Sequence, residues 1–319
     1  MKVFLTGATG AIGPSTVRAL LDAGHDVRAV ARDPDKAARL REAGAEPVTV
    51  DLFDADTVAR ATAGCDAIAH LATNVPPISR MARKSSWAMH NRLRTDATRN
   101  LLSAAKTNGI ETVVKESVTF VYPDHGDGWI DESVPPDDRV TLLAPTLEGE
   151  ALVTAFAGTG VRGVVLRFGL FYGPASRGVD ESLRLARWRA STVAGSADAY
   201  MSSIHTDDVA TAAVAALGAP SGIYNVVDDH PVTRRDYLDA FAGAFDLPKL
   251  RLNPAWLLRL VAGSSAGALI ASQRVANGRL RTATGWEPAY PSAQQGWAAI
   301  VTTTRARFRS PTSRTRCSL

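Results

Sequence analysis

A glycine-rich turn near the start of the chain, residues 6–13, constrains the fold more than any other feature of the sequence. It follows the short apolar run 3–5 and precedes a segment of helical periodicity, residues 15–21. Glycines let such a turn leave a strand tightly and let backbone N–H groups approach a pyrophosphate, which the N-terminus of the next helix also favours. The order of strand, turn and helix therefore predicts a dinucleotide site, with these residues in contact with the cofactor: Gly7, Thr9, Gly10, Ala11, Ile12 and Gly13.

Strand-like apolar runs alternate with helical patterns as far as about residue 170. We expect strands at 2–6, 26–31, 46–50, 67–71, 112–117 and 163–168, and helices at 13–23, 34–43, 55–63, 87–107 and 146–158. This alternation predicts an α/β fold, a Rossmann-type doubly wound parallel sheet with helices on both faces. We expect a dinucleotide-binding domain at 1–174, to which 201–228 return, and a smaller substrate-binding part formed by 175–200 and 229–301.

The net charge of +4 comes from the end of the chain. Residues 302–319 contain five arginines and no acidic residue, so the rest of the protein carries −1. We therefore expect a basic, disordered tail at 302–319 and no nucleic-acid surface on the folded body. No apolar run approaches the length of a membrane span, and Cys65 and Cys317 offer neither a disulfide framework nor metal-ligand spacing. These features predict a cytoplasmic protein with no metal site and no membrane association.

The turn has the spacing G-x-x-G-x-x-G behind a threonine, and in this it resembles the extended, epimerase-like branch of the short-chain dehydrogenase/reductase family. Similar segments recur at 166–174, 203–210, 222–227 and 285–288, so the resemblance extends to about residue 301. It implies a substrate pocket lined by residues 74–90, for which a variable surface loop is the alternative, and a homodimer formed through helices 87–107 and 146–158. It also implies further cofactor contacts beyond the glycine turn, namely Asp51, Leu52, Leu71, Ala72, Thr73, Glu116, Ser117, Phe168, Gly169 and Leu170.

The end of the second predicted strand indicates which cofactor is used. An NAD site carries an acidic residue there to accept a hydrogen bond from the ribose 2′-hydroxyl. This chain has Ala31 followed by Arg32, and a guanidinium suits a 2′-phosphate. We therefore expect NADP(H), with Arg32 as a contact, although a solvated loop arginine is the alternative.

The family's catalytic Ser/Thr, Tyr and Lys set is missing. Alignment on Glu150 places Leu142 at the tyrosine position and Thr146 at the lysine position, and no Tyr-x-x-x-Lys occurs between residues 120 and 160. No catalytic residue is assigned, and the weak candidates for a proton donor are Ser117, Thr119, Tyr122 and His205. For each of them a structural role is the simpler interpretation.

Two more side chains in these segments call for an explanation. Glu116 replaces a small residue beside the cofactor, where a lone carboxylate is costly to bury, so we expect a partner and name Arg94 as the candidate. Asp207 is expected to serve as a helix N-cap.

Two functions fit this pattern. The first is an NADPH-dependent ketoreductase acting on an aromatic polyketide, like the ketoreductases of angucyclinones in antibiotic biosynthesis, with the substrate supplying its own proton. General acid catalysis contributes ~10²–10⁴-fold, so a missing acid has to be replaced by another proton source or by a reaction that needs none. The second is a non-catalytic NADP(H)-binding sensor of the family's atypical branch. The expected partner is a small aromatic molecule.

Overall fold

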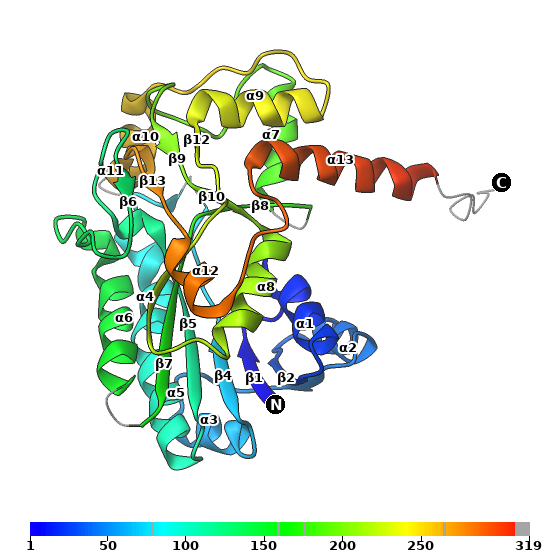
Figure 1. The fold of residues 1–319 in the computed structure, drawn as a ribbon, viewed down its shortest axis with the longest axis vertical. Helices are drawn as coiled ribbons and strands as arrows, with labels where there is room; N and C mark the ends of the chain where they lie inside the picture. The colour runs from blue at the N-terminus through cyan, green and yellow to red at the C-terminus, as the bar shows by residue number, and fades with distance from the viewer. Residues whose placement is uncertain (78–79, 158–159, 175–176, 264–265, 310–319) are drawn as a thin grey trace.

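Seven parallel strands form the central sheet of the computed structural model, which describes residues 1–77, 80–157, 160–174, 177–263 and 266–309. Their order is β11-β7-β5-β4-β1-β2-β3 (Figure 1). The bounds are β1 (Lys2–Thr6), β2 (Asp26–Val30), β3 (Glu46–Val48), β4 (Ala67–His70), β5 (Thr112–Val118), β7 (Arg162–Phe168) and β11 (Gly222–Val226). This is the predicted Rossmann-type α/β fold, and the strand order reverses between β1 and β4, where such folds bind their ligands.

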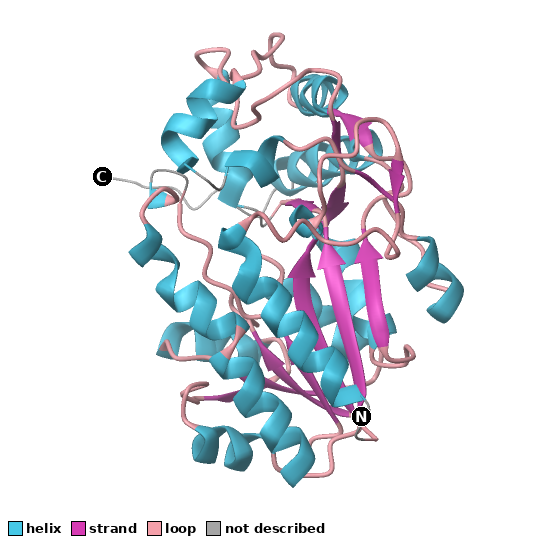
Figure 2. Cartoon of the chain, turned by 90° about the vertical axis from the view of Figure 1, so that its left-hand side faces the viewer, coloured by secondary structure: helices cyan, strands magenta, loops and turns pink. Residues whose placement is uncertain are grey.

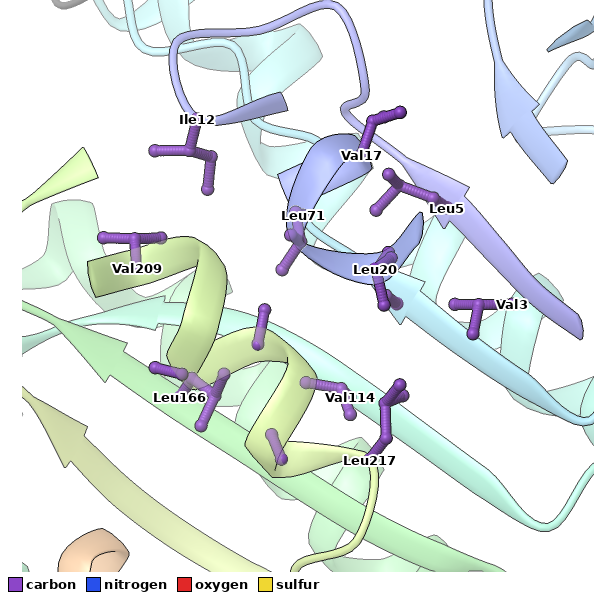
Figure 3. Close-up of a cluster of buried hydrophobic side chains, with 14 of the residues drawn as sticks. Val3, Leu5, Ile12, Val17, Leu20, Leu71, Val114, Leu166, Val209 and Leu217 are labelled. Carbon is purple, nitrogen blue, oxygen red and sulfur yellow. The ribbon is translucent and has the colours of Figure 1, made fainter. Parts of the chain in front are cut away.

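Helices cover both faces of the sheet. One face packs against α1 (Gly13–Asp22), α2 (Pro34–Glu42) and α8 (Thr206–Ala216), with a core that includes Leu5, Leu20 and Leu166 (Figure 3). The other face packs against α3 (Ala55–Thr62), α5 (Asp96–Thr107) and α6 (Ala144–Phe156). The central strands β1 and β4 are buried on both faces and are nearly continuously apolar, whereas β2, nearer the edge of the sheet, alternates between buried and more exposed residues.

The predicted long helix at 87–107 is interrupted. A 3₁₀ turn, η2 (Lys84–Trp87), leads into α4 (Ala88–Arg94), and α5 begins only at Asp96. Thr95 lies between them with its hydroxyl donating to the Asn91 carbonyl at 3.1 Å. Such back-bonding by threonine bends helices, and the break falls at this residue while the Thr95 N–H keeps its bond to the same carbonyl at 3.0 Å.

A smaller part of the protein lies beyond the carboxyl ends of the strands (Figures 1 and 2). Its own core lies between α7 (Arg177–Ala186), α9 (Arg234–Ala244) and α13 (Ala293–Arg309). The short strands β8 (Leu170–Tyr172) and β10 (Ser203–His205) pair in parallel and connect it to the sheet. The remaining short elements are β6 (Trp129–Ile130), η3 (Thr119–Val121), η4 (Thr141–Leu143), β9 (Tyr200–Met201), β12 (Val232–Thr233), α10 (Ala255–Ala262), α11 (Ala266–Ile270), β13 (Arg274–Val275) and α12 (Gly278–Thr284).

The C-terminal helix extends into the segment expected to be disordered. α13 continues to Arg309, so residues 302–309 are helical, and the remaining residues of the predicted tail, 310–319, lie outside the described part. The helix can extend this far because no proline follows Pro291 until Pro311. Among the described residues no helix is long and apolar enough to cross a membrane.

Candidate functional site

The glycine turn packs too closely for side chains at two of its positions. Gly7 has φ +83°, and a Cβ there would lie 2.6 Å from the Leu71 carbonyl oxygen. A Cβ on Gly13 would lie 2.1 Å from the Ala8 carbonyl oxygen. The turn is thus held against the end of β4, and α1 begins directly behind it with Pro14 in its first turn. This is the geometry that a pyrophosphate cradle at a helix N-terminus requires, and the role of the turn in cofactor binding stays a prediction.

A directed chain of hydrogen bonds fixes the segment after β4. The Ala72 N–H donates to the Thr6 hydroxyl at 3.3 Å, and Thr6 donates to Nδ1 of His70 at 2.7 Å. His70 Nε2 then donates to the Leu93 carbonyl at 3.0 Å, which settles the tautomer because a carbonyl only accepts. Burial, aided by the nearby Lys115 charge, lowers the pKa of His70 to about 3. A neutral His70 therefore ties β1, the segment 71–73 and α4 together.

The end of β2 presents Arg32 to solvent. Ala31 is buried, Arg32 is exposed, and Arg32 forms no ion pair within the described part of the chain. The next residue, Asp33, caps α2 by accepting the Lys36 N–H at 3.0 Å. The nearest acidic residue is thus occupied by its own helix, which is consistent with the prediction that Arg32 meets a 2′-phosphate.

The other predicted cofactor contacts lie at the same edge of the sheet, because the carboxyl ends of parallel strands meet there. Asp51 follows β3 and accepts the Phe53 N–H at 3.0 Å. Leu52 is fixed through its carbonyl, which accepts from Asn100 at 3.0 Å. Gly169 follows β7, and a Cβ on it would lie 2.7 Å from the Ser202 carbonyl oxygen. The role of these residues as cofactor contacts stays a prediction.

Arg94 and Glu116 form the ion pair that the sequence suggested. The Arg94 guanidinium contacts both carboxylate oxygens of Glu116, at 2.7 Å and 3.0 Å, and also donates to the Glu116 carbonyl at 2.7 Å. Only 2% of the Arg94 side chain and 6% of the Glu116 side chain are exposed. Both oxygens of this carboxylate are therefore paired, although burial still raises the pKa of Glu116 against the lowering effect of Arg94 and Lys115.

A second buried ion pair lies between α6 and β7. Arg167 contacts both oxygens of Glu150, at 2.9 Å and 2.6 Å, and the Ser117 hydroxyl donates to the same carboxylate. Lys115, also buried, lies between the two pairs and donates to the Glu116 carbonyl at 3.1 Å. Burial and the nearby Arg94 lower the pKa of Lys115 to about 7. The sequence analysis missed Lys115, although a lysine inside an apolar strand was the available signal.

The four weak candidates for a proton donor are all buried. Ser117 is bound to Glu150, and the Tyr122 hydroxyl donates to the Asn225 side chain at 2.8 Å. Thr119 lies in η3 with 1% of its surface exposed. His205 also has 1% exposed, and its Nδ1 accepts the Asp207 N–H at the start of α8. All four are thus withdrawn from solvent, and Nε2 of His205 has no hydrogen-bond partner in the described part of the chain.

The helix cap at α8 differs from our expectation. His205, not Asp207, is the N-cap, because its ring nitrogen accepts the backbone N–H two residues on. Asp207 lies inside the first turn, and its carboxylate accepts the Ser15 hydroxyl at 2.7 Å. Asp207 thus joins α8 to α1 just after the glycine turn, and the prediction that it caps the helix was wrong.

The positions that the resemblance assigns to the missing tyrosine and lysine lie at the start of α6. Leu142 is in η4, and Thr146 is buried in the first turn of the helix. Neither side chain carries an acid or a cation. The described residues contain no group of histidines, cysteines and acids that could hold a metal ion.

Comparison with known proteins identifies the family. The model of the "NAD dependent epimerase/dehydratase family" matches residues 3–226. The chain belongs to this family. It is 33% identical over 309 residues to the 3-diazoavenalumate denitrifying reductase of a Streptomyces species, covering 93% of this chain and 99% of that protein. Membership and such reductase relatives make the protein an oxidoreductase with a nicotinamide cofactor.

Other relatives are more distant. A 4-hydroxy-2-methyl-3-oxo-4-farnesyl-3,4-dihydroquinoline-1-oxide ketoreductase of Stigmatella aurantiaca is 28% identical over 248 residues, covering 75% of this chain and 71% of that protein. Among solved structures, human SDR39U1 with NADPH superposes with a TM-score of 0.78 at 23% identity, covering 95% of this chain and 99% of that one. MoeE5 with UDP-glucose and NAD gives the same TM-score and identity, covering 97% and 100%. These two structures support the fold alone.

Proposed function

We propose that the protein is an NADPH-dependent reductase that transfers hydride to an aromatic substrate without taking a proton from one of its own side chains. One observation carries this proposal. The tight turn around Gly7 and Gly13 has the shape that a pyrophosphate cradle needs, whereas all four candidate donors are buried and the hydroxyls of Ser117 and Tyr122 are already bonded to Glu150 and Asn225. The chain's contribution is then to orient the nicotinamide and substrate and to exclude water.

The first substrate class is a ketone on an aromatic polyketide of the angucyclinone type, as in the biosynthesis of the antibiotic simocyclinone. Hydride transfer to a ketone forms an alkoxide, which must be protonated or stabilised as it develops. A neighbouring phenol of the substrate, hydrogen-bonded to the carbonyl, can polarise it and give up that proton. The Stigmatella ketoreductase supports carbonyl reduction in this family.

A second substrate class, aromatic diazo compounds, is favoured by the Streptomyces relative. That protein is named for a diazo substrate and for a reduction that removes nitrogen from it. When an arenediazonium ion is reduced, the electron pair of the hydride from NADPH forms the new C–H bond. The C–N bond breaks, and dinitrogen leaves with the electron pair of that bond. NADPH becomes NADP⁺ and no proton is consumed. A site without an accessible acid suits this reaction particularly well.

The test compares substrates in pairs while NADPH consumption is followed. A peri-hydroxy ketone should be reduced at least tenfold faster than its methyl ether, and an arenediazonium should release one dinitrogen per NADPH. Equal rates for the phenol and its ether would show that the protein supplies the proton. NADPH binding without turnover of either class would contradict the proposal and favour the sensor. A cytoplasmic location and a homodimer through α4, α5 and α6 stay predictions.

A further inference from the structure

The smaller part of the protein contains a cavity of about 100 Å³. It lies between β8, α7, α9 and α13, so most of its wall comes from the predicted substrate-binding part and the rest from the end of the predicted dinucleotide-binding domain. Aromatic side chains form much of its wall, and Phe241 and Trp297 meet with ring centres 5.0 Å apart at an interplanar angle of 76°. We call it the aromatic cavity.

The lining of the aromatic cavity is uncharged. It consists of aliphatic and aromatic side chains and the hydroxyl residues Ser182, Ser191 and Thr192. The Ser191 hydroxyl donates to the Arg251 carbonyl at 2.8 Å, so it is already paired. Without a cation on the wall, the cavity cannot compensate a pyrophosphate or a carboxylate. Its occupant is a neutral, apolar group.

One buried hydrogen-bond donor on the wall of the aromatic cavity lacks a well-placed acceptor among the described residues. The Trp297 indole N–H, on a residue with 3% exposure, has no hydrogen-bond partner of good geometry in the described part. It lies close enough to the Tyr237 hydroxyl to lower the pKa of that phenol, against a larger rise from burial. Buried donors usually find a partner, so the wall of the aromatic cavity retains hydrogen-bonding capacity at Trp297.

The volume limits what fits. Sites for drug-sized ligands measure about 300–1,000 Å³, whereas an apolar cavity of about 150 Å³ accommodates benzene. At about 100 Å³ the aromatic cavity is smaller than that benzene-binding cavity, so one ring already requires its side chains to move slightly and a fused polycycle does not fit. Its wall begins with Leu170, the predicted nicotinamide contact at the start of β8. A ring held there lies next to the segment that is predicted to meet the reducing end of the cofactor.

We propose that the aromatic cavity binds a single neutral aromatic ring of the substrate and selects one-ring substrates over fused polycyclic ones. This inference rests on the proposed reductase function and narrows its substrate class. It favours a monocyclic arene, such as a phenol-derived diazonium, whose ring enters the cavity while its reacting carbon stays at the nicotinamide edge.

The experiment measures binding and turnover separately, using the full chain with NADP⁺ bound. Calorimetry with phenol, 2-naphthol and 2-anthrol should give affinities that fall at least tenfold from one ring to three. Ser182→Leu, which fills the cavity, should weaken phenol binding at least tenfold. Phe241→Ala, which enlarges it, should strengthen 2-naphthol binding by a similar factor. Phe245→Ala is the control for losing a phenyl group from the same core, because Phe245 does not itself line the cavity and lies next to Phe241 and Trp297, with ring centres 5.1 Å and 6.2 Å away.

The outcomes separate the two proposals. Equal or tighter binding of 2-anthrol by the wild type, or phenol binding unchanged by Ser182→Leu, overturns the cavity assignment. The wild-type series does not depend on any variant folding correctly. If phenol binds as predicted but no arene is reduced, the cavity assignment stands and the reductase function fails. If arenes are reduced with no preference for one ring, the reductase stands and the selectivity fails.

Discussion

Arg94 on α4 holds the carboxylate of Glu116 on β5 through two guanidinium nitrogens, at 2.7 Å and 3.0 Å, and both residues are buried at the end of the sheet where the cofactor is expected. The pair connects the helix that follows the predicted substrate loop to the strand that carries the predicted cofactor contacts. Buried ion pairs contribute little to stability in themselves, but removing one partner leaves an uncompensated charge.

Glu116→Gln should therefore lower the free energy of unfolding by about 3–5 kcal/mol. The control is Glu148→Gln, which removes a carboxylate from a pair with Arg99 in which both side chains are about half exposed. That change should lower the free energy by less than about 1 kcal/mol. Urea unfolding measures both. Equal losses of unfolding free energy in the two variants would show that Glu116 does not compensate a buried charge on Arg94.

Lys115 should make stability depend on pH. Its folded pKa of about 7 lies below the ordinary 10.5, so between these values the unfolded chain binds one proton that the folded chain does not. Stability should then rise with pH from about 7 towards 10.5, by up to ~1.4 kcal/mol per pH unit, and should level off below 7. The difference between wild type and Lys115→Met, measured by urea unfolding at pH 7.5 to 9.5, isolates this contribution. A difference that stays constant with pH would refute it.

The glycine turn should not tolerate a single methyl group at Gly13. Gly13→Ala places a carbon 2.1 Å from a backbone oxygen, so we expect at least a tenfold loss of NADPH affinity or a loss of folding. Gly243→Ala in α9 is the matched control, because nothing lies within 4 Å of its added carbon and alanine favours helices. Fluorescence titration with NADPH measures the loss of affinity, and a thermal melt shows whether the variant still folds. If both variants bind NADPH like the wild type, the turn is not the pyrophosphate site.

Arg32 should decide between the two nicotinamide cofactors. Removing a charged contact to the 2′-phosphate costs about 1.5–3 kcal/mol, so Arg32→Ala should weaken NADPH binding about 10- to 150-fold and leave NADH nearly unchanged. The ratio of the two dissociation constants is the measured quantity. A ratio that does not change would make Arg32 a solvated loop residue and leave the cofactor preference without an explanation.

The parts of the fold that follow from local physics could be predicted from the sequence. The order of strand, glycine turn and helix, the apolar runs and the partner of Glu116 all depend on nearby pattern or on the cost of burying a charge. The break at Thr95 was not predictable from periodicity, because the helical pattern of the sequence continues through it, and the Thr95 N–H and hydroxyl both bond the Asn91 carbonyl there.

The rest of the site depends on contacts between segments distant in the sequence. Asp207 looked like a cap because acidic residues favour that position, but Ser15, 192 residues away, takes its carboxylate. His205 then supplies the cap. Lys115 acquires its unusual setting from α4 and α6, and the aromatic cavity requires β8, α7, α9 and α13 together. No local pattern encodes such combinations.

The most direct test of the central claim is to follow deuterium from NADPH labelled at the nicotinamide C4 into an aromatic product, in the wild type and in Tyr122→Phe. This variant removes the only tyrosine of residues 120–160 and a hydrogen bond to Asn225. We predict deuterium on the reduced carbon in both proteins, with rates within about threefold, because no protein acid takes part. Transfer that disappears in Tyr122→Phe while the variant remains folded, or no transfer by wild type with NADPH bound, would contradict the account.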